Sequence, residues 1–325
     1  MKKNIALVTG GYSGESVISY KSAATIFENL DRTKWNVFLI DINVDGWFYT
    51  DENKQKISID KNDFTLQVGV EKIHFDAVMI GLHGTPGEDG KLQGYFDCLN
   101  IPYTSCDVTS SAITFNKRYT VAVAAFAGIP VAKSMHLFKH TSFVIEDLLS
   151  ELRLPVFVKP NNGGSSLGMS KVNNAEDLSS AVAKAFGVDD QVLVEEYISG
   201  REFTIGVFKT KGEIITLPIT EIVTQNEFFD FQAKYEGASE EITPAIITDA
   251  MATKICMEAK KAYQVFNCSG VVRIDFIYNE NVDMPFLLEI NTVPGQSAAS
   301  IIPQQVKAMG WSLQEFYTKL LEECF

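Results

Sequence analysis

The sequence predicts a mixed α/β fold of two or three domains that begins with a parallel-sheet domain. Three observations support this prediction. The chain of 325 residues is long for a single hydrophobic core. Its first part alternates apolar strands with a glycine turn and a helix, which is the order found in parallel sheets. Near its end, two apolar segments carry polar side chains at every second position, as strands of a buried sheet do.

The first part of the chain reads as strand, helix and strand in sequence. We expect strands at 4–9, 35–40 and 76–82, a glycine turn at 10–11, and helices at 15–30 and 91–99, with a short strand at 101–103. The segment 45–70 is polar and rich in turn residues, so it is expected to be irregular, as a hairpin excursion.

A second unit begins near Ser110 and a third near Gly200. The elements expected there are helices at 117–127, 175–186 and 248–266, and strands at 155–159, 191–197, 202–208, 271–278 and 286–291. A Gly-rich loop at 161–168 follows one strand, and a polar, aromatic segment without periodicity occupies 225–241. There is no internal repeat and no low-complexity tract, so the units should pack closely together.

Composition excludes several classes of function. A net charge of −13 argues against a nucleic-acid or anionic-membrane partner. The five cysteines are scattered without a CxxC pair, which favours reduced thiols and a cytoplasmic location. The four histidines form no HxxxH or HxxH pair, so a zinc site is not expected. We find no secretion signal and no apolar run long enough to span a membrane.

The strongest chemical signal lies in the two strands near the C-terminus. Arg273 and Asp275 share one face of the first strand, and Glu289 and Asn291 share one face of the second. Oxygen ligands of this kind suit Mg²⁺ bound together with a substrate phosphate. A solvated face or an ion pair with Arg273 explains the same residues about as well, but the surrounding apolar residues favour burial, where charges need a partner or a metal.

The loop that begins at Lys159 favours phosphate contact. Three glycines allow backbone N–H groups to approach an anion, Ser165 and Ser166 add hydroxyl donors, and Lys159 adds a positive charge. A plain turn is the alternative, because Gly and Ser are common turn residues. The loop is not a Walker motif, since GxxxxGK[ST] is absent.

Other polar loops can be interpreted either as parts of a binding site or as surface turns. The residues alone favour a tight turn at 10–15, with Ser13 as helix N-cap and Glu15 favoured by the helix dipole. The loop that starts at His83 has the density of Gly and polar side chains of a site loop. Glu195 and Glu202, at strand ends, suit either an adenine and ribose contact or an exposed position.

Seven segments in order give a resemblance to a known family. GGYSGES, HGTPGEDG, KPNNGGSSLG, EEYISGREF, FDFQAKY, RIDF and LLEINTVPG span nearly the whole chain. Together they resemble the ATP-grasp superfamily and, within it, the D-alanine–D-alanine ligase family. The resemblance implies a three-domain ATP-grasp fold, with a Rossmann-like domain at 1–109, a central domain at 110–198 and a catalytic domain at 199–325 whose lid loop covers 225–241.

The resemblance also implies an activity. It is the ATP-dependent ligation of two D-alanine molecules through an acyl phosphate, with release of ADP and phosphate, in the synthesis of peptidoglycan precursors. ATP would be the co-substrate, two Mg²⁺ ions would be the cofactors, and Mn²⁺ would be able to substitute. D-alanine and ATP would be the partners, without nucleic acid or membrane, and the protein would be a homodimer.

The resemblance assigns roles to particular residues. Glu15 would bind the ammonium of the first D-alanine, against the reading from the residues alone, with His83 lining the same site. Glu15, Ser165 and Tyr235 would form a hydrogen-bonded triad, Arg273 and the Gly295 N–H would form the oxyanion hole, and Ser300 would contact the second carboxylate. The metal ligands would be Asp275, Glu289 and Asn291. The ATP-binding residues would be Lys117, Lys159, Ser165, Ser166, Glu195, Glu196, Ile198, Glu202 and Lys234.

The chain departs from the family pattern at the lid. The family usually carries YDYxxKY, whereas Phe229 and Phe231 lack the two hydroxyls. Tyr235 favours D-alanine as the second substrate, because relatives that make D-alanyl-D-lactate replace the lid segment. Two alternatives stay open: another ATP-grasp carboxylate–amine ligase, and a nucleotide-binding regulatory protein with a dead site. The first-domain motifs oppose the former, and the intact metal and phosphate residues oppose the latter.

Overall fold

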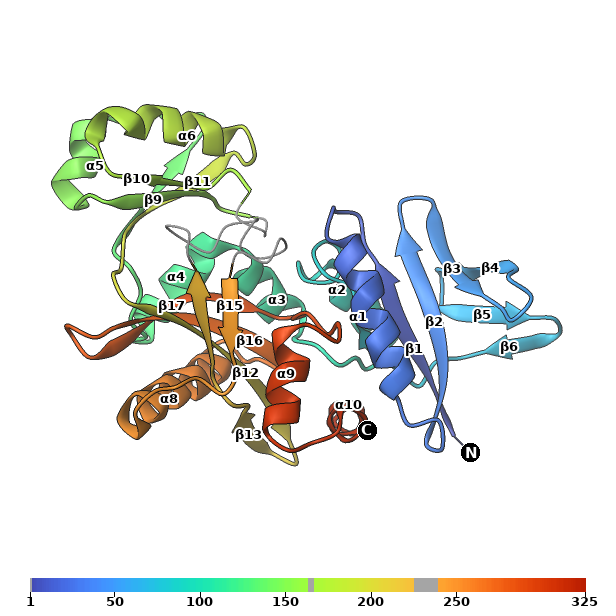
Figure 1. Cartoon of the computed structure of the whole chain (residues 1–325). Helices are drawn as coiled ribbons and strands as arrows, with labels where there is room; N and C mark the ends of the chain where they lie inside the picture. Colours follow the sequence, from blue (N-terminus) through green and yellow to red (C-terminus); the bar gives the residue numbers. More distant parts are fainter. Residues whose placement is uncertain (1, 163–166, 225–238) are drawn as a thin grey trace.

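Three β-sheets organise the chain. The computed structural model describes residues 2–162, 167–224 and 239–325, and these residues form the sheets and the helices that cover them (Figure 1). The sheets follow one another in the sequence. The mixed α/β class predicted from the sequence is therefore confirmed.

The first sheet has seven strands in the order β6-β5-β4-β3-β2-β1-β7. Only β1 pairs in parallel with its neighbours β2 and β7, and the other pairs are antiparallel. Its elements are β1 (Lys3–Gly10), α1 (Ser16–Asn29), β2 (Trp35–Asn43), β3 (Gly46–Thr50), β4 (Lys56–Asp60), β5 (Thr65–Val68), β6 (Glu71–Ile73), β7 (Ala77–Ile80) and α2 (Lys91–Leu99).

The expected irregular excursion at 45–70 is wrong. These residues form β3, β4 and β5, which extend the parallel strands as an antiparallel meander. Trp47, Ile59, Phe64 and Leu66 bury their side chains there in a core with β1 and β7. The polar residues between them face solvent, and this alternation is typical of a sheet that has one buried and one solvent-exposed face. The short strand expected at 101–103 is limited to one parallel bridge between Tyr103 and Val78.

The second sheet is antiparallel, in the order β10-β9-β11-β8. Two helices cover it and fill its core with Leu148, Leu178 and Val182 (Figure 1, upper left). Its elements are β8 (Ser134–Phe138), α5 (Ile145–Glu151), β9 (Val156–Pro160), β10 (Ser170–Val172), a 3₁₀ turn (Ala175–Asp177), α6 (Leu178–Phe186) and β11 (Gln191–Glu196).

The third sheet carries the two strands that the sequence analysis singled out. Its order is β15-β14-β12-β16-β17, with β13 paired to β12. Its elements are β12 (Arg201–Thr210), β13 (Glu213–Thr216), β14 (Thr220–Thr224), β15 (Ser239–Ile242), α8 (Asp249–Val265), β16 (Val271–Asn279), β17 (Met284–Asn291), α9 (Ile301–Ala308) and α10 (Leu313–Glu322). None of the helices in the described ranges is both long and apolar enough to span a bilayer.

Two hydrophobic cores cross the expected domain limits. Helices α3 (Val108–Phe115) and α4 (Lys117–Phe126) follow the first sheet in the chain, yet Ile113 and Ala124 pack into the core of the third sheet. In a second shared core, Ile5 of β1 and Ile26 of α1 pack with Phe316 of α10. The division at 109 and 198 stays a prediction, and these contacts tie the first and third sheets tightly together.

Candidate active site

One cavity of about 360 Å³ gathers side chains from the regions of the first and third sheets and from the helices between them. Its walls come from α1, the loop after β7, the α3–α4 junction, strands β12, β16 and β17, and the loop that leads into α9. The predicted site residues that line it are Glu15, His83, Lys117, Glu202, Arg273, Asp275, Glu289, Asn291, Gly295 and Ser300. Glu15 and Ser300, which are 285 positions apart in the sequence, thus meet at one place.

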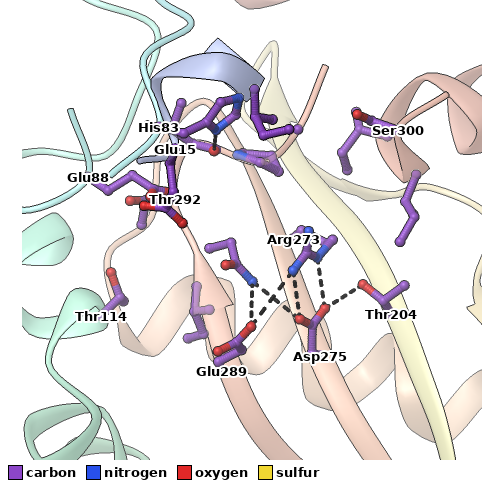
Figure 2. A pocket seen from close by; sticks show the side chains of 18 of the residues that line it. Glu15, His83, Glu88, Thr114, Thr204, Arg273, Asp275, Glu289, Thr292 and Ser300 are labelled. Carbon is purple, nitrogen blue, oxygen red and sulfur yellow. Dashed lines mark hydrogen bonds and ion pairs between the residues drawn. The ribbon is translucent and has the colours of Figure 1, made fainter. Parts of the chain in front are cut away.

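The two strands predicted near the C-terminus, β16 and β17, are confirmed and pair directly with each other. In the antiparallel register, Arg273 lies opposite Asn291 and Asp275 lies opposite Glu289. All four residues line the cavity, and Figure 2 shows Arg273, Asp275 and Glu289 together there. The register shifts by a β-bulge directly after Asp275. Such a bulge locally changes the direction of side chains, and it is a frequent feature beside active sites.

Arg273 links the two carboxylates. Its Nε lies 3.0 Å from Asp275 Oδ1, and one terminal nitrogen lies 2.9 Å from Asp275 Oδ2 and 3.8 Å from Glu289 Oε1. Thr204 on β12 also donates to Asp275 Oδ1. Burial alone would lower the pKa of Arg273, but the charge and hydrogen bonds of Asp275, aided by Glu289 and Glu88, raise that pKa above its ordinary value.

The carboxylate pair has the donor chemistry of a magnesium site. Among the described residues, no group of three or more His, Cys, Asp or Glu side chains is placed to hold a metal ion. Two carboxylates and one amide oxygen fit Mg²⁺, because this ion keeps several waters and shares substrate phosphates. The Asn291 amide nitrogen now lies 3.3 Å from Asp275 Oδ2 and 3.5 Å from Glu289 Oε1, so its oxygen would face the ion after an amide rotation.

Glu15 lies where α1 starts, beside the loop after β7. The expectation that Ser13 is the helix N-cap is wrong, since α1 begins at Ser16 and Glu15 occupies the cap position. Ser13 Oγ instead accepts a hydrogen bond from the Glu15 N–H, at 3.3 Å. Gly84 has a φ of +68°, and a Cβ there would collide with the Glu15 carboxylate. The absence of a side chain at Gly84 leaves room for this carboxylate in the cavity.

Glu88 is a cavity residue that the sequence analysis did not single out. Its Oε2 accepts a hydrogen bond of 2.7 Å from the Gly84 N–H. Burial raises the pKa of Glu88 to about 8, and the nearby charge of Glu15 adds to this rise, against smaller lowering effects from backbone N–H groups and Arg273. The loop was recognised as a candidate site loop, but nothing in the sequence distinguished Glu88 from Asp89.

His83 lies on the same loop and is almost fully buried. Its Nδ1 lies 2.7 Å from the carbonyl oxygen of Val293, and its Nε2 lies 2.8 Å from the hydroxyl of Ser22. Burial lowers the pKa of His83 to about 4, the Arg273 charge contributes in the same direction, and the hydrogen bond to Val293 opposes both. The imidazole is therefore neutral near pH 7.

The loop from Gly295 to Ser300 is tightly folded onto α9. Ser300 is the N-cap residue of α9, and its hydroxyl lies 2.7 Å from that of Ser297. A Cβ on Gly295 would lie 2.9 Å from Ser300 Oγ, so the backbone of one residue and the hydroxyl of the other are close neighbours. Gly295 and Ser300 both line the cavity that Arg273 also lines.

Four further candidates for ATP binding that the structure describes lie on or beside the second sheet and are not among the residues that line the cavity. Lys159 on β9 forms an ion pair with the buried Glu195 on β11. Glu196 accepts a hydrogen bond of 2.9 Å from the Arg153 N–H, and Ile198 is half-buried just after β11. The structure thus places Lys159, Glu195 and Glu196 on one sheet, with Ile198 just after its strand β11, and Lys117 and Glu202 in the cavity.

Asn161 connects these two groups. Its carbonyl accepts a hydrogen bond of 3.2 Å from the Lys117 N–H, and its side-chain oxygen accepts one of 2.8 Å from the Arg118 N–H. Its Nδ2 is buried and has no partner among the residues that the structure describes. A buried amide donor at the start of the Gly-rich loop is consistent with a site for an anionic ligand. Ser165, Ser166, Lys234 and Tyr235 lie outside the described residues.

Family models match both halves of the chain. The description "D-ala D-ala ligase N-terminus" matches residues 4–106, and "D-ala D-ala ligase C-terminus" matches residues 117–322. A D-alanine–D-alanine ligase from Flavobacterium johnsoniae is 46% identical over 98% of this chain and 98% of its own length. One from Parabacteroides distasonis is 44% identical over 99% of this chain and 98% of its own length.

A solved structure gives the same result for the fold. The VanG D-Ala:D-Ser ligase from Enterococcus faecalis has a TM-score of 0.91 with this chain at 30% identity, and the match covers 100% of both chains. The arrangement of the three sheets is therefore shared over the full length.

Proposed function

The chain belongs to the D-alanine–D-alanine ligase family, and from this premise we propose how its own residues perform the reaction. The protein is an ATP-dependent ligase that joins two D-alanine molecules into D-alanyl-D-alanine for peptidoglycan precursor synthesis. The observation that carries the proposed assignment is the register that pairs Asp275 with Glu289 in the cavity that also holds Glu15, Arg273 and Gly295.

We assign the first D-alanine to the part of the cavity near Glu15. An ammonium group there would face the Glu15 carboxylate, with Glu88 and the neutral His83 close by. Because burial and the neighbouring Glu15 raise the pKa of Glu88 to about 8, Glu88 holds a proton near pH 7 when no ammonium is bound. A bound ammonium favours the ionised form of Glu88, so the two carboxyl groups together would balance the substrate's charge.

The phosphate side of the reaction is assigned to the basic residues and the carboxylate pair. Lys117, Lys159 and Lys234 would neutralise the charge that spreads over the phosphates during transfer. Asp275, Glu289 and Asn291 would hold two Mg²⁺ ions, for which Mn²⁺ could substitute, and these ions would supply Lewis-acid neutralisation of the phosphate oxygens. Glu195, Glu196 and Ile198 are proposed to face the adenine, and Glu202 the ribose.

Peptide bond formation would follow in two steps. A carboxylate oxygen of the first D-alanine attacks the γ-phosphorus of ATP, ADP leaves, and an acyl phosphate remains. The amine of the second D-alanine then attacks the acyl carbon, and inorganic phosphate leaves as the amine loses a proton. Arg273 and the Gly295 N–H would stabilise the oxyanion of the tetrahedral intermediate, with about 3–4 kcal/mol for each donor.

Closure over the acyl phosphate is assigned to residues outside the described part of the chain. The proposed triad joins Glu15 to Ser165 and Tyr235, and it would exclude water from a reactive intermediate. The proposal for Ser165, Ser166, Lys234 and Tyr235 depends on the motif positions in the sequence alone. A homodimer and a cytoplasmic location are likewise proposed from the family.

The identity of the second substrate has two candidates, D-alanine and D-serine. Ser300 is proposed to bind the carboxylate of the second D-alanine, with the N-terminal N–H groups of α9 behind it. The structural similarity to the D-Ala:D-Ser ligase VanG makes D-serine the specific alternative at this position. The curated relatives at 44–46% identity are D-alanine–D-alanine ligases and favour D-alanine.

The decisive experiment combines ATP, Mg²⁺ and D-alanine with the purified protein. Phosphate release would be followed continuously, and the product would be identified by mass spectrometry, with L-alanine, D-serine and D-lactate as competing substrates. One phosphate for each D-alanyl-D-alanine would support both the reaction and the assignment of the second substrate.

Two other outcomes would change the proposal. A mixed product from D-alanine and D-serine would keep the mechanism and move the second-substrate assignment. ATP binding without turnover of any amino acid would favour a regulatory protein with a dead site.

A further inference from the structure

A series of buried hydrogen bonds connects helix α1 and the loop after β7 to the backbone beside the proposed oxyanion hole. It begins at Ser22 in the middle of α1, passes through His83 after β7, and ends at the carbonyl of Val293, two residues before Gly295. Ser22 is fully buried, and His83 and Val293 are each less than a tenth exposed. No role has been assigned above to Ser22.

The directions of these hydrogen bonds follow from simple chemistry. A carbonyl oxygen only accepts, so His83 Nδ1 carries the proton that it donates to Val293 over 2.7 Å. A neutral imidazole with Nδ1 protonated has only an acceptor at Nε2, so Ser22 donates to it over 2.8 Å. The Ser22 oxygen in turn accepts from the Gln296 N–H, at 3.0 Å. One tautomer of His83 satisfies every bond in the chain.

The same loop holds the backbone before Gly295 at several points. His83 binds the carbonyl of Val293, and the Val293 backbone is close enough to Glu88 to lower the pKa of that carboxyl group. Ser22 binds the backbone of Gln296, directly after Gly295. Pro294 restricts the backbone between these contacts because its φ is nearly constant. Gly295 is thus held on both sides, and its own N–H has no hydrogen-bond partner within residues 2–162, 167–224 and 239–325.

Both ring nitrogens of His83 are occupied by protein partners. The imidazole therefore has no free nitrogen with which to bind a substrate while these bonds are present. This arrangement suits a group that acts through another residue. The backbone N–H of His83 also donates to the hydroxyl of Ser19 at 2.9 Å. Hydrogen bonds therefore fix both the backbone and the ring of His83.

We infer that Ser22 and His83 form a positioning relay that holds the Gly295 N–H in place for the tetrahedral intermediate. The inference rests on the proposed function of Gly295. Catalytic donors need placement within a fraction of an ångström, and a misplacement of about 1 Å costs about a hundredfold in rate. Through the relay, helix α1 and the loop after β7 fix the position of the oxyanion-hole donor at Gly295. Neither Ser22 nor His83 needs to contact the substrate in this role.

The first test compares substitutions along the relay with a matched control on the same helix. Ser22→Ala removes one buried hydroxyl from the relay. Thr25→Val removes one from the next turn of α1, where the Thr25 hydroxyl donates to the Lys21 carbonyl of its own helix. Steady-state kinetics of the full-length protein should show kcat lower by about tenfold or more for Ser22→Ala, with KM for ATP changed less than about twofold. Thr25→Val should match the wild type in both.

His83 allows a rescue experiment. In His83→Asn, the side-chain amide keeps an N–H donor near the position of Nδ1, whereas His83→Leu has none. We expect His83→Leu to lower kcat about a hundredfold and His83→Asn to recover about tenfold of that loss. A tetrahedral phosphinate analogue of the dipeptide should lose affinity in parallel with kcat, because it reports binding of the transition state.

The inference would be overturned by wild-type kcat and analogue affinity in Ser22→Ala, by equal losses in Ser22→Ala and Thr25→Val, or by no difference between His83→Asn and His83→Leu. Nitrogen-15 NMR of the wild-type protein gives a readout without turnover, since the relay requires a proton on Nδ1 and none on Nε2 of His83. The opposite tautomer would also overturn it. Absence of any ligation by the wild type would instead contradict the proposed function and leave the NMR result to decide the relay.

Discussion

Arg273 lies between two carboxylates that the proposed reaction also needs for a metal ion. Its guanidinium makes two hydrogen bonds to Asp275 and approaches Glu289 to 3.8 Å. A cation bound by the same carboxylates would share their charge with Arg273. The guanidinium then has donors to spare for an oxyanion, since it carries five N–H groups.

The metal-ligand assignment of Glu289 gives the first prediction. Glu289→Gln keeps the shape of the side chain but removes the charge opposite Asp275. We expect kcat to fall by more than about a hundredfold, because a metal ion at transferring phosphates contributes several kcal/mol to the transition state. Phosphate release at saturating Mg²⁺ measures this loss.

Glu280→Gln is the matched control, since Glu280 lies on the same β16–β17 hairpin with an exposed side chain that approaches Arg201 only to 3.8 Å. Its turnover should equal that of the wild type. Near-normal turnover of Glu289→Gln would contradict the metal assignment.

The buried, neutral state of His83 predicts a pH dependence of stability. Burial, with the charge of Arg273, lowers its pKa from 6.5 to about 4 in the folded protein. The unfolded chain therefore binds a proton first as the pH falls, and the folded state loses stability between about pH 6.5 and pH 4. The contribution of this one group is about 3 kcal/mol in total.

Urea unfolding of the ligand-free protein at pH 7, 5.5 and 4.5 tests this prediction. His83→Asn cannot titrate, so the difference between its free energy of unfolding and that of the wild type should shrink as the pH falls. A difference that stays constant over this range would mean that His83 is not buried in its neutral form.

At the scale of single elements, Gln305 joins α9 to the third sheet. Its amide nitrogen donates to the Thr204 carbonyl and the Thr220 hydroxyl, each at 3.0 Å, and its oxygen accepts from the Gly206 N–H at 2.9 Å. The side chain is fully buried. It therefore holds α9, whose N-cap is Ser300, against the strand β12, whose Thr204 side chain donates to Asp275.

Gln305→Leu should lower the free energy of unfolding by about 3 kcal/mol, because it leaves buried backbone groups without partners. Denaturant titration with Gln314→Leu as the control measures this effect, since Gln314 is exposed on α10. The control should stay within about 0.5 kcal/mol of the wild type. A similarly small change for Gln305→Leu would show that the network adjusts to the loss.

The elements that the sequence predicted well are those with a strong local pattern. The alternation in β16 and β17 identified the faces of Asp275 and Glu289, and the register places these two residues opposite each other. The bulge after Asp275 has no local signal. The strands β3 to β5 were missed because their outer faces are polar and only their partners make them strands.

Helix α10 was not predicted, although its buried residues Leu313, Phe316, Tyr317, Leu320 and Leu321 have helical spacing. That signal was present in the sequence. The hydrogen bond from Ser22 to His83 could not be predicted, because a serine on a helix gives no information about a loop 61 residues later.

At the scale of the whole molecule, the first sheet and the last two helices share one core. Phe316 on α10 is fully buried, with its ring centroid 5.3 Å from that of Phe208 on β12. The same cluster contains Ile5 and Leu7 of β1 and Trp35 of β2. Length and composition indicated more than one core, but they could not indicate that distant ends of the chain would share one.

Phe316→Ala should destabilise the protein by about 3–5 kcal/mol, which is typical of a large aromatic side chain removed from a core. Because the core is shared, hydrogen exchange should show faster opening of β1 amides as well as of α10 amides. Phe126→Ala is the control, since Phe126 is 95% exposed. Loss of protection in α10 alone, with β1 unaffected, would mean that the two regions unfold independently.

The shared core also has a consequence for the synthesis of this protein. A ribosome makes residues 3–80 early, but the apolar face that β1 and α1 present to α10 meets its partners only after residues 313–321 have left the exit tunnel. During nearly the whole of translation, the nascent chain carries that face exposed and open to self-association or to chaperones. Chains released from ribosomes that stalled shortly before residue 313 should therefore aggregate. Every proposed catalytic residue is already present in these chains.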